Sequence, residues 1–440
     1  MPVRRVKAFA LVTALSLGVI GLVSAGAGAQ SGSAPGVTDK AIKIGYIWSE
    51  TGVAASSFTG MGEAFQARID AENAKGGVNG RKIDVTIIDD KSSGANLTAA
   101  KDLVENQKVF TLVNDSSFGF LTWRYLLQEA KVPYIGGGFD GNYYSLEGNE
   151  DVVSVLGNVS ANSDLTSMIF ANAMKKKGAT KTAALAYGAS ASSVGSTKAN
   201  QSYAVPAAGM QAVYTNTTVD FGSSDVSPLV LGIKNSGADA VYLPMAAATN
   251  IAVVQGLKQA GVKMKANIIA TGYGQELLDS PAASTFGPED LFFLQTKPVA
   301  INDAATKKFQ ADLKKYSDYT GVPSYGQYQG YLAGDLLVAG LEAAGKNPTR
   351  DSFIQGLRGI GKWNGADLTC QPIDISLENF GKQPKQNCAY YSNVKDGKFV
   401  NAFGGKPIIG KLVGSPEALA ENAKKGLPAA ATTTTAAPAP

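Results

Sequence analysis

One segment near the N-terminus, residues 41–91, constrains the fold of this chain more than any other. It begins with an apolar stretch at 41–47 that is typical of a β-strand, and a loop of small residues follows at 48–58. A second predicted strand lies at 82–88, and an amphipathic helix separates the two strands. A strand, a helix and a strand in this order form a βαβ unit, and such units build parallel sheets.

The helix between these strands can be placed from its residue spacing. Its apolar positions follow the i, i+3, i+4, i+8 pattern of a helix that packs on a sheet. They are Met61, Ala64, Phe65 and Ile69. We expect Gly76 and Gly77 to end the helix, because glycine readily adopts the left-handed conformation. The pair Asn79-Gly80 then turns the chain into the second strand.

The order of these features resembles a known family. A Thr-Gly loop at 51–52, the block Gly-Gly-Val-Asn-Gly-Arg at 76–81 and the pair Asp89-Asp90 are similar to the substrate-binding proteins of branched-chain amino acid ABC importers. The resemblance covers roughly residues 40–410. It implies an α/β fold of the type I periplasmic binding protein class, with two doubly wound parallel-sheet lobes joined by a multi-strand hinge. It also implies that Asp89 and Asp90 support a turn.

The same resemblance implies a function without catalysis. We expect a monomer that binds a small-molecule ligand, needs no cofactor and delivers the ligand to an ABC permease in the membrane. Closure of the two lobes around the ligand is the expected motion.

Strands and helices alternate along the chain, which together with the resemblance predicts its domains. They are a signal peptide at 1–29, a flexible leader at 30–40, lobe 1 at 41–156 plus 297–366, lobe 2 at 157–296 plus 367–410, and a C-terminal extension with a low-complexity tail at 411–440. In lobe 2 we expect a helix at 162–176 and a strand at 211–214. Strands at 291–294 and 368–375 are expected to cross between the lobes.

The N-terminus has the pattern of a secretory signal. Arg4, Arg5 and Lys7 precede an apolar run, and small residues at 25–29 allow cleavage after Ala27 or Ala29. An uncleaved anchor is the alternative, but the run is short and interrupted by glycine. No cysteine follows the signal to carry the lipid anchor common in similar proteins. We therefore expect a secreted or periplasmic protein.

Charge and residue types exclude several functions. Loss of the three basic residues of the signal lowers the formal net charge from +4 to +1, which argues against nucleic acid as a partner. The chain contains no histidine, so Ser-His-Asp catalysis and histidine metal sites cannot form. Its two cysteines, Cys370 and Cys388, are expected to form one local disulfide, with two free thiols as the alternative.

Ligands of open α/β sheets bind beyond the carboxyl ends of the strands. This rule selects loops at 48–58, 114–120, 136–142, 187–195 and 245–249, with 272–275 adjacent. The candidate ligand-binding residues in these loops are Trp48, Phe58, Ser116, Ser117, Phe118, Gly138, Phe139, Asp140, Tyr187, Met245, Thr249 and Tyr273. For Trp48 a core position is an equal alternative, and Phe120 is expected to pack in the helix that follows it.

The resemblance also suggests what the ligand is not. The family's lobe 1 serine falls near Ser117 or Phe118, its threonine falls on Asp140, and its ammonium-binding acid falls near Thr249. An aspartate repels an α-carboxylate, and a threonine cannot neutralise an ammonium group. We therefore expect an apolar or aromatic ligand, with a hydroxyl or cationic group received by Asp140 and by the hydroxyls of Ser116 and Ser117.

The sequence is also compatible with three other functions. They are an amino-acid receptor of the same importer class, a secreted ligand sensor of the same fold, and a hydrolase that uses carboxylates such as Asp115 and Asp140. Turnover of a bound compound would favour the hydrolase.

Overall fold

The computed structural model describes residues 34–137, 142–157, 164–223, 225–381 and 387–424. The predicted signal peptide and the low-complexity tail from 425 onward lie outside these residues. Among the described residues, no helix is both long and apolar enough to cross a membrane.

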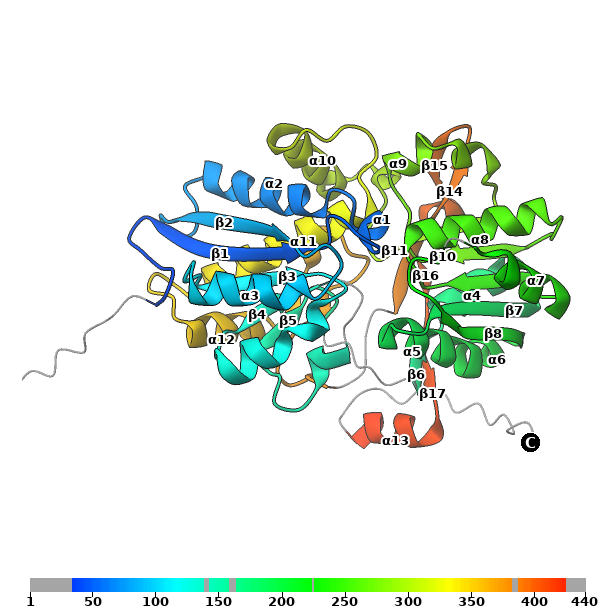
Figure 1. Ribbon diagram of the computed structural model, residues 1–440, viewed down its shortest axis with the longest axis horizontal. Helices are drawn as coiled ribbons and strands as arrows, with labels where there is room; N and C mark the ends of the chain where they lie inside the picture. The colour runs from blue at the N-terminus through cyan, green and yellow to red at the C-terminus, as the bar shows by residue number, and fades with distance from the viewer. Residues whose placement is uncertain (1–33, 138–141, 158–163, 224, 382–386, 425–440) are drawn as a thin grey trace, which may run out of the picture. The chain divides into compact units, whose positions relative to one another are not determined.

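The N-terminal βαβ unit belongs to a parallel five-stranded sheet with the order β2-β1-β3-β4-β5 (Figure 1). Its strands are β1 (Ala41–Trp48), β2 (Lys82–Asp89), β3 (Thr111–Asp115), β4 (Tyr134–Gly136) and β5 (Val152–Ser154). The helices that accompany it are α1 (Ala55–Phe58), α2 (Met61–Ala74), α3 (Ala95–Glu105), α10 (Ala304–Tyr316), α11 (Tyr325–Ala343) and α12 (Arg350–Ile360).

Helices cover both faces of this sheet, and Figure 1 shows α2 and α3 on opposite sides of β1. Alternate residues of β1 face the two sides: Tyr46 packs with α2 and α11, whereas Ile47 packs with α3. The predicted stripe of α2 is confirmed, because all four of its residues are fully buried. Gly76 and Gly77, at φ +115° and +74°, end this helix as expected.

The other large sheet joins eight strands among the described residues, in the order β15-β14-β11-β10-β9-β7-β8, with β16 on β14. Its strands are β7 (Lys181–Tyr187), β8 (Gln211–Val219), β9 (Ala240–Leu243), β10 (Ala266–Ile269), β11 (Asp290–Leu294), β14 (Cys388–Lys395), β15 (Lys398–Asn401) and β16 (Ile408–Ile409). The stretch from β8 to β11 is parallel, whereas β14 and β15 are antiparallel. This is the doubly wound α/β fold that the sequence predicts, with an antiparallel edge.

Helices also cover both faces of the eight-stranded sheet. One face packs against α7 (Ser227–Ser236) and α8 (Ala247–Gln259), and the other against α4 (Ile169–Lys176) and the π-helix η4 (Asn200–Ala204). The shorter strands and α-helices are β6 (Leu165–Ser167), α5 (Ala191–Ala199), α6 (Val205–Ala207), α9 (Gln275–Leu278), β12 (Lys362–Trp363), β13 (Ile373–Asp374), β17 (Leu412–Gly414) and α13 (Pro416–Lys424).

Three expected elements differ from the structure. The helix expected at 162–176 begins only at Ile169, because β6 precedes it and pairs with β17. The strand expected at 211–214 continues to Val219. The crossing expected as a strand at 368–375 contains only β13, and a left-handed turn at 365–367 precedes it.

Two crossings between the sheets lie side by side. Thr296, after β11, forms a bridge with Thr369, and the N–H of Lys297 donates to the carbonyl of Leu368 at 2.7 Å. The predicted disulfide is present: Cys370, in the second crossing, is bonded to Cys388 at the start of β14. On the chain-entropy model, a loop of this size stabilises the fold by roughly 3 kcal/mol.

Asp239 joins the starts of three strands in the eight-stranded sheet and provides a pH-dependent test of this packing. Its carboxylate accepts hydrogen bonds from the backbone N–H groups of Thr180 and Lys181, and it pairs with Lys265. Partial burial tends to raise its pKa, but these donors outweigh burial and lower the pKa to about 2.

Because this pKa lies below the unfolded value of about 3.9, the carboxylate stabilises the fold above pH 4. That contribution is lost as the pH falls towards 2. We expect Asp239→Asn to be less stable than wild type at pH 6, and the difference to shrink progressively between about pH 4 and pH 2. Urea unfolding across this range measures it, and a difference independent of pH would contradict the assignment.

Candidate functional site

The carboxyl ends of the strands carry the loops that form the candidate site. In the five-stranded sheet these loops follow β1, β2 and β3, and in the eight-stranded sheet they follow β7, β8 and β9. Several of the described loop residues contact one another between the two sheets.

A buried carboxylate, Asp90, holds the loops of the five-stranded sheet together. Its oxygens accept hydrogen bonds from the hydroxyl of Ser49 after β1, from the N–H of Ser92, from the amide of Asn96 in α3 and from the hydroxyl of Ser116 after β3. The Asp90 side chain is fully buried. One side chain therefore fixes the loops that follow three adjacent strands.

The neighbouring Asp89 holds a second turn. Its Oδ1 accepts from the N–H groups of Glu50 and Thr51 at 3.0 and 3.2 Å, and its Oδ2 accepts from the Thr51 hydroxyl at 2.6 Å. Burial tends to raise the pKa of Asp89, but these donors lower it overall. The aspartate pair therefore supports turns, as the resemblance implies.

Aromatic rings connect the loops of the two sheets. Phe118, after β3, lies 6.4 Å from the ring of Phe221, after β8, and Phe221 lies 4.2 Å from the ring of Tyr187, at the end of β7. Phe118 and Phe221 are only half-buried. Next to them, Phe120 is 43% exposed, and its ring lies 6.0 Å from that of Phe118. The expectation that Phe120 packs in the helix that follows it is therefore wrong.

The N-terminus of α8 lies at the same place. Ala246 caps this helix without a side-chain acceptor of its own, and its N–H donates to the hydroxyl of Tyr187 at 3.3 Å. That hydroxyl in turn donates to Thr249 at 2.6 Å. Burial raises the pKa of Tyr187 despite these hydrogen bonds, so the hydroxyl stays protonated and can donate.

Two serines of α1, the short helix after β1 of the five-stranded sheet, complete the cap of α8. The hydroxyls of Ser57 and Ser56 in α1 accept from the N–H groups of Ala247 and Ala248, each at 3.3 Å. A helix N-terminus leaves its first N–H groups without intrahelical partners, and hydroxyl acceptors satisfy them. The candidate site loops therefore touch one another in this arrangement.

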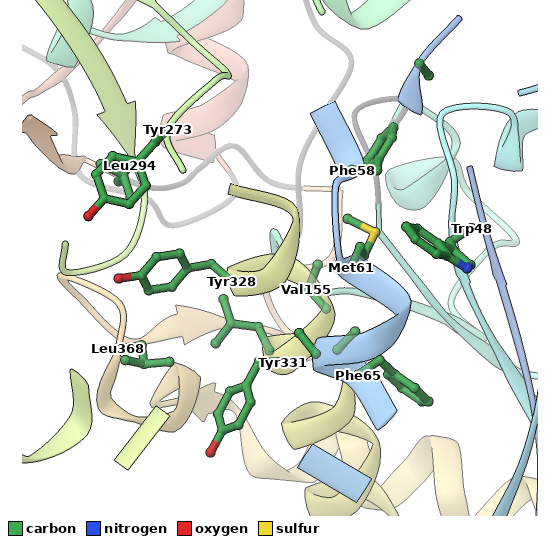
Figure 2. Packing of buried hydrophobic residues seen from close by; sticks show 14 of the residues in the cluster. Trp48, Phe58, Met61, Phe65, Val155, Tyr273, Leu294, Tyr328, Tyr331 and Leu368 are labelled. Carbon is green, nitrogen blue, oxygen red and sulfur yellow. The ribbon is translucent and has the colours of Figure 1, made fainter. Parts of the chain in front are cut away.

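The remaining predicted site residues have different surroundings. Trp48, Phe58 and Tyr273 are buried in the main hydrophobic core. Figure 2 shows Trp48 and Phe58 beside Met61 of α2, and the ring of Tyr273 lies 4.2 Å from that of Phe399. The contact of Trp48, Phe58 and Tyr273 with a ligand stays a prediction. Gly138, Phe139 and Asp140 lie outside the described residues, so their predicted roles also stay predictions.

Some of the predicted polar site residues are buried and hydrogen-bonded within the protein, whereas others are partly exposed to solvent. The Ser116 hydroxyl is fully buried and bonded to Asp90, whereas Ser117 is half-buried. Met245 and Thr249 are buried at the start of α8, where the Met245 carbonyl accepts from Asn250 at 2.9 Å. The structure therefore brings Ser117, Phe118, Tyr187 and Thr249 into one group of loops.

Sequence reasoning did not single out Phe221, Ser56 or Ser57. Phe221 follows β8, and the strand-end rule would have selected it if the strand had been extended to Val219. Ser56 and Ser57 lie within the predicted loop at 48–58, but a serine in a loop of small residues carries no signal of its own.

Of the two carboxylates considered for a hydrolase, Asp140 lies outside the described residues, and Asp115 does not have an exposed position. Asp115 is fully buried, and its Oδ2 accepts from the hydroxyl of Tyr46 at 3.0 Å. Burial and the nearby carboxylate together raise the pKa of Tyr46 well above its usual value. Asp115 is the last residue of β3, and its side chain bonds to Tyr46 of β1 in the core.

The fold and these loops define a two-lobed ligand-binding protein, and a family model agrees. The model of the periplasmic binding protein family matches residues 41–398, so the chain belongs to this family. No curated protein sequence matches the chain.

Solved structures with the same fold cover most of the chain. A fatty acid ABC transporter substrate-binding protein from Thermomonospora curvata is 20% identical, with a TM-score of 0.68, covering 88% of this chain and 95% of its own. An R. palustris solute-binding protein in complex with benzoate is 18% identical, with a TM-score of 0.67, covering 84% of this chain and 98% of its own. A branched-chain amino acid transporter substrate-binding protein from Streptococcus pneumoniae in complex with isoleucine is 20% identical, with a TM-score of 0.66, covering 82% of this chain and 100% of its own.

The polar network beneath the site gives a stability prediction. Asp90→Ala removes the shared acceptor of Ser49, Asn96 and Ser116. The two serine hydroxyls can still bond to each other, and the Asn96 amide keeps its hydrogen bond to Asn114, so only part of the network loses its partners. We therefore expect this variant to lower the free energy of unfolding by roughly 2–3 kcal/mol. Asp84→Ala, at an exposed position of β2, is the control and is expected to change it by less than about 0.5 kcal/mol. Urea unfolding measures both, and equal effects would show that the network does not support the loops.

Proposed function

We propose that this protein is the extracytoplasmic substrate-binding component of an ABC importer. It binds a small organic ligand between the loops of its two sheets and performs no chemistry on it. The family supports this function, and the observation that carries it is the aromatic group formed by Phe118, Phe221 and Tyr187, which draws on both sheets.

We propose further that the ligand is apolar or aromatic. The half-buried rings of Phe118 and Phe221 offer apolar faces, and aromatic pairs add about 0.5–1.5 kcal/mol beyond their buried area. The first turn of α8 carries no acidic residue, and the Thr249 hydroxyl already accepts a hydrogen bond from Tyr187. A zwitterionic amino acid would therefore find no counter-charge for its ammonium group on this turn.

The structural relatives bind both kinds of ligand. Those from R. palustris are in complex with benzoate and 4-hydroxybenzoate, whereas the S. pneumoniae protein is in complex with isoleucine. Ser117 and Asp140 are proposed to receive polar groups of the ligand. An amino-acid receptor of the same importer class is the alternative that the experiments below distinguish.

The remaining parts of this proposal concern the cell. We propose a membrane permease as partner, a monomer as the working form, and export by a cleaved signal peptide to the periplasm or cell surface.

A ligand screen tests the substrate class. Binding to the folded state at a hundredfold excess over the Kd stabilises it by roughly 2.7 kcal/mol, which a thermal-shift assay detects. We expect benzoates or fatty acids to raise the Tm and branched-chain amino acids not to do so. Phe221→Ala is expected to weaken the binding by roughly tenfold or more, because it removes one ring of the aromatic group.

Phe170→Ala is the matched control for this variant. Phe170 is also half-buried, but it packs on Tyr242 and Phe293 at the other face of the eight-stranded sheet. We expect it to lower the Tm and leave the ligand-induced shift intact. If both variants lose the shift equally, Phe221 acts only through stability.

Thr249 offers a gain-of-function test. We expect Thr249→Glu to create measurable binding of isoleucine, because a carboxylate in the first turn of α8 can pair with the ammonium group. Thr249→Gln, of similar size and without charge, should not. Isothermal titration calorimetry measures both, and isoleucine binding by the wild type would refute the apolar ligand class.

A further inference from the structure

The second crossing between the sheets contains a left-handed turn. Gly365, Ala366 and Asp367 have φ values of +61°, +52° and +58° in succession. Glycine adopts this conformation freely and aspartate tolerates it, but alanine has neither freedom nor a side chain that bonds locally. Ala366 is therefore the strained residue of the turn.

Both ends of this turn are anchored, but to different sheets. On the N-terminal side, the indole Nε1 of Trp363 donates to Asp335 of α11 at 3.1 Å, beside the five-stranded sheet. On the C-terminal side, the disulfide joins Cys370 to Cys388 of β14, in the eight-stranded sheet. Residues 364–369 therefore have to absorb any rotation of one sheet relative to the other along this crossing.

The other described crossing is bound to the same segment. Thr296 bridges Thr369, and the Lys297 N–H donates to the Leu368 carbonyl next to the turn. Leu368 is fully buried, and the Thr369 hydroxyl donates to the carbonyls of Asn364 and Gln371. These contacts hold the turn in its left-handed form.

The structure shows the arrangement in which the site loops meet. The N–H groups of Ala247 and Ala248 bond to serine hydroxyls of α1, and the rings of Phe118 and Phe221 are in contact. We call this arrangement, in which loops of the two sheets bond to one another, the closed arrangement.

We propose that the left-handed turn at 365–367 is strained in the closed arrangement and relaxes when the protein opens. The strain biases the free protein towards the open state and lowers its affinity for ligand. The effect on affinity rests on the proposed function, whereas the effect on the opening equilibrium does not. A left-handed alanine changes an equilibrium constant by roughly five- to thirtyfold if only one of the two states contains it.

The test measures opening directly in the ligand-free protein. Spin labels are attached at Glu63→Cys on α2 and Leu231→Cys on α7, two exposed positions beside different sheets, with the native disulfide intact. Pulsed electron–electron double resonance then gives the distribution of distances between the two spin labels. Ala366→Gly is expected to shift this distribution towards the short, closed distance by at least about fivefold in population ratio.

Lys108→Gly is the matched control. Lys108 also has a positive φ, of +55°, but lies between α3 and β3, away from the crossings. It should relieve similar strain and leave the distances unchanged. Asp367→Gly is a second variant of the turn, and it should move the distribution in the same direction as Ala366→Gly.

Two results would overturn the proposal: an unchanged distribution in both turn variants, or a shift to longer distances. A ligand identified by the thermal-shift screen adds a second readout, since Ala366→Gly should tighten its binding about fivefold by calorimetry. Failure of the screen to find any ligand would count against the proposed function alone, because the distance measurement needs no ligand.

Discussion

The buried carboxylate of Asp90 is the interaction on which the candidate site most depends. It accepts hydrogen bonds from the loops after β1 and β3 and from α3, while it directly follows β2 itself. A buried polar group costs free energy unless it is hydrogen-bonded, and four donors bond to the oxygens of Asp90. The loops that follow three parallel strands are thereby joined to one another in the ligand-free protein.

This rigid polar base leaves the aromatic side chains free to meet a ligand. Hydroxyl and carboxylate groups of the five-stranded sheet are turned inward, whereas Phe118 stays half-buried at the loop and reaches Phe221 of the other sheet. The start of α8 is capped by hydroxyls of Tyr187, Ser56 and Ser57, so its N–H groups are satisfied without a charged residue. The contacts between the loops of the two sheets are therefore mostly between neutral groups.

Particular elements show how far sequence patterns carry. The apolar stripe of α2, the glycine pair that ends it and the disulfide are local features, and all three are confirmed. The strand-end rule selected Tyr187 and Thr249, which bond to each other. It missed Phe221 because β8, an edge strand with mostly exposed or half-buried residues, lacks the apolar pattern that marks its true end at Val219. It also selected Trp48 and Tyr273, whose rings are buried in the core and whose contact with a ligand stays a prediction; a pattern of loops does not show which way a ring points.

The sequence by itself determined the class of fold, the family and the absence of histidine chemistry, because periodicity, glycine positions and residue types are properties of short segments. Tertiary structure alone decided which loops meet, that Ser116 is engaged by Asp90, and that Ala366 takes a left-handed conformation between two anchored ends. These features arise from contacts between residues that are tens to hundreds of positions apart. Such contacts depend on how two sheets and their crossings pack, and no local pattern encodes that packing.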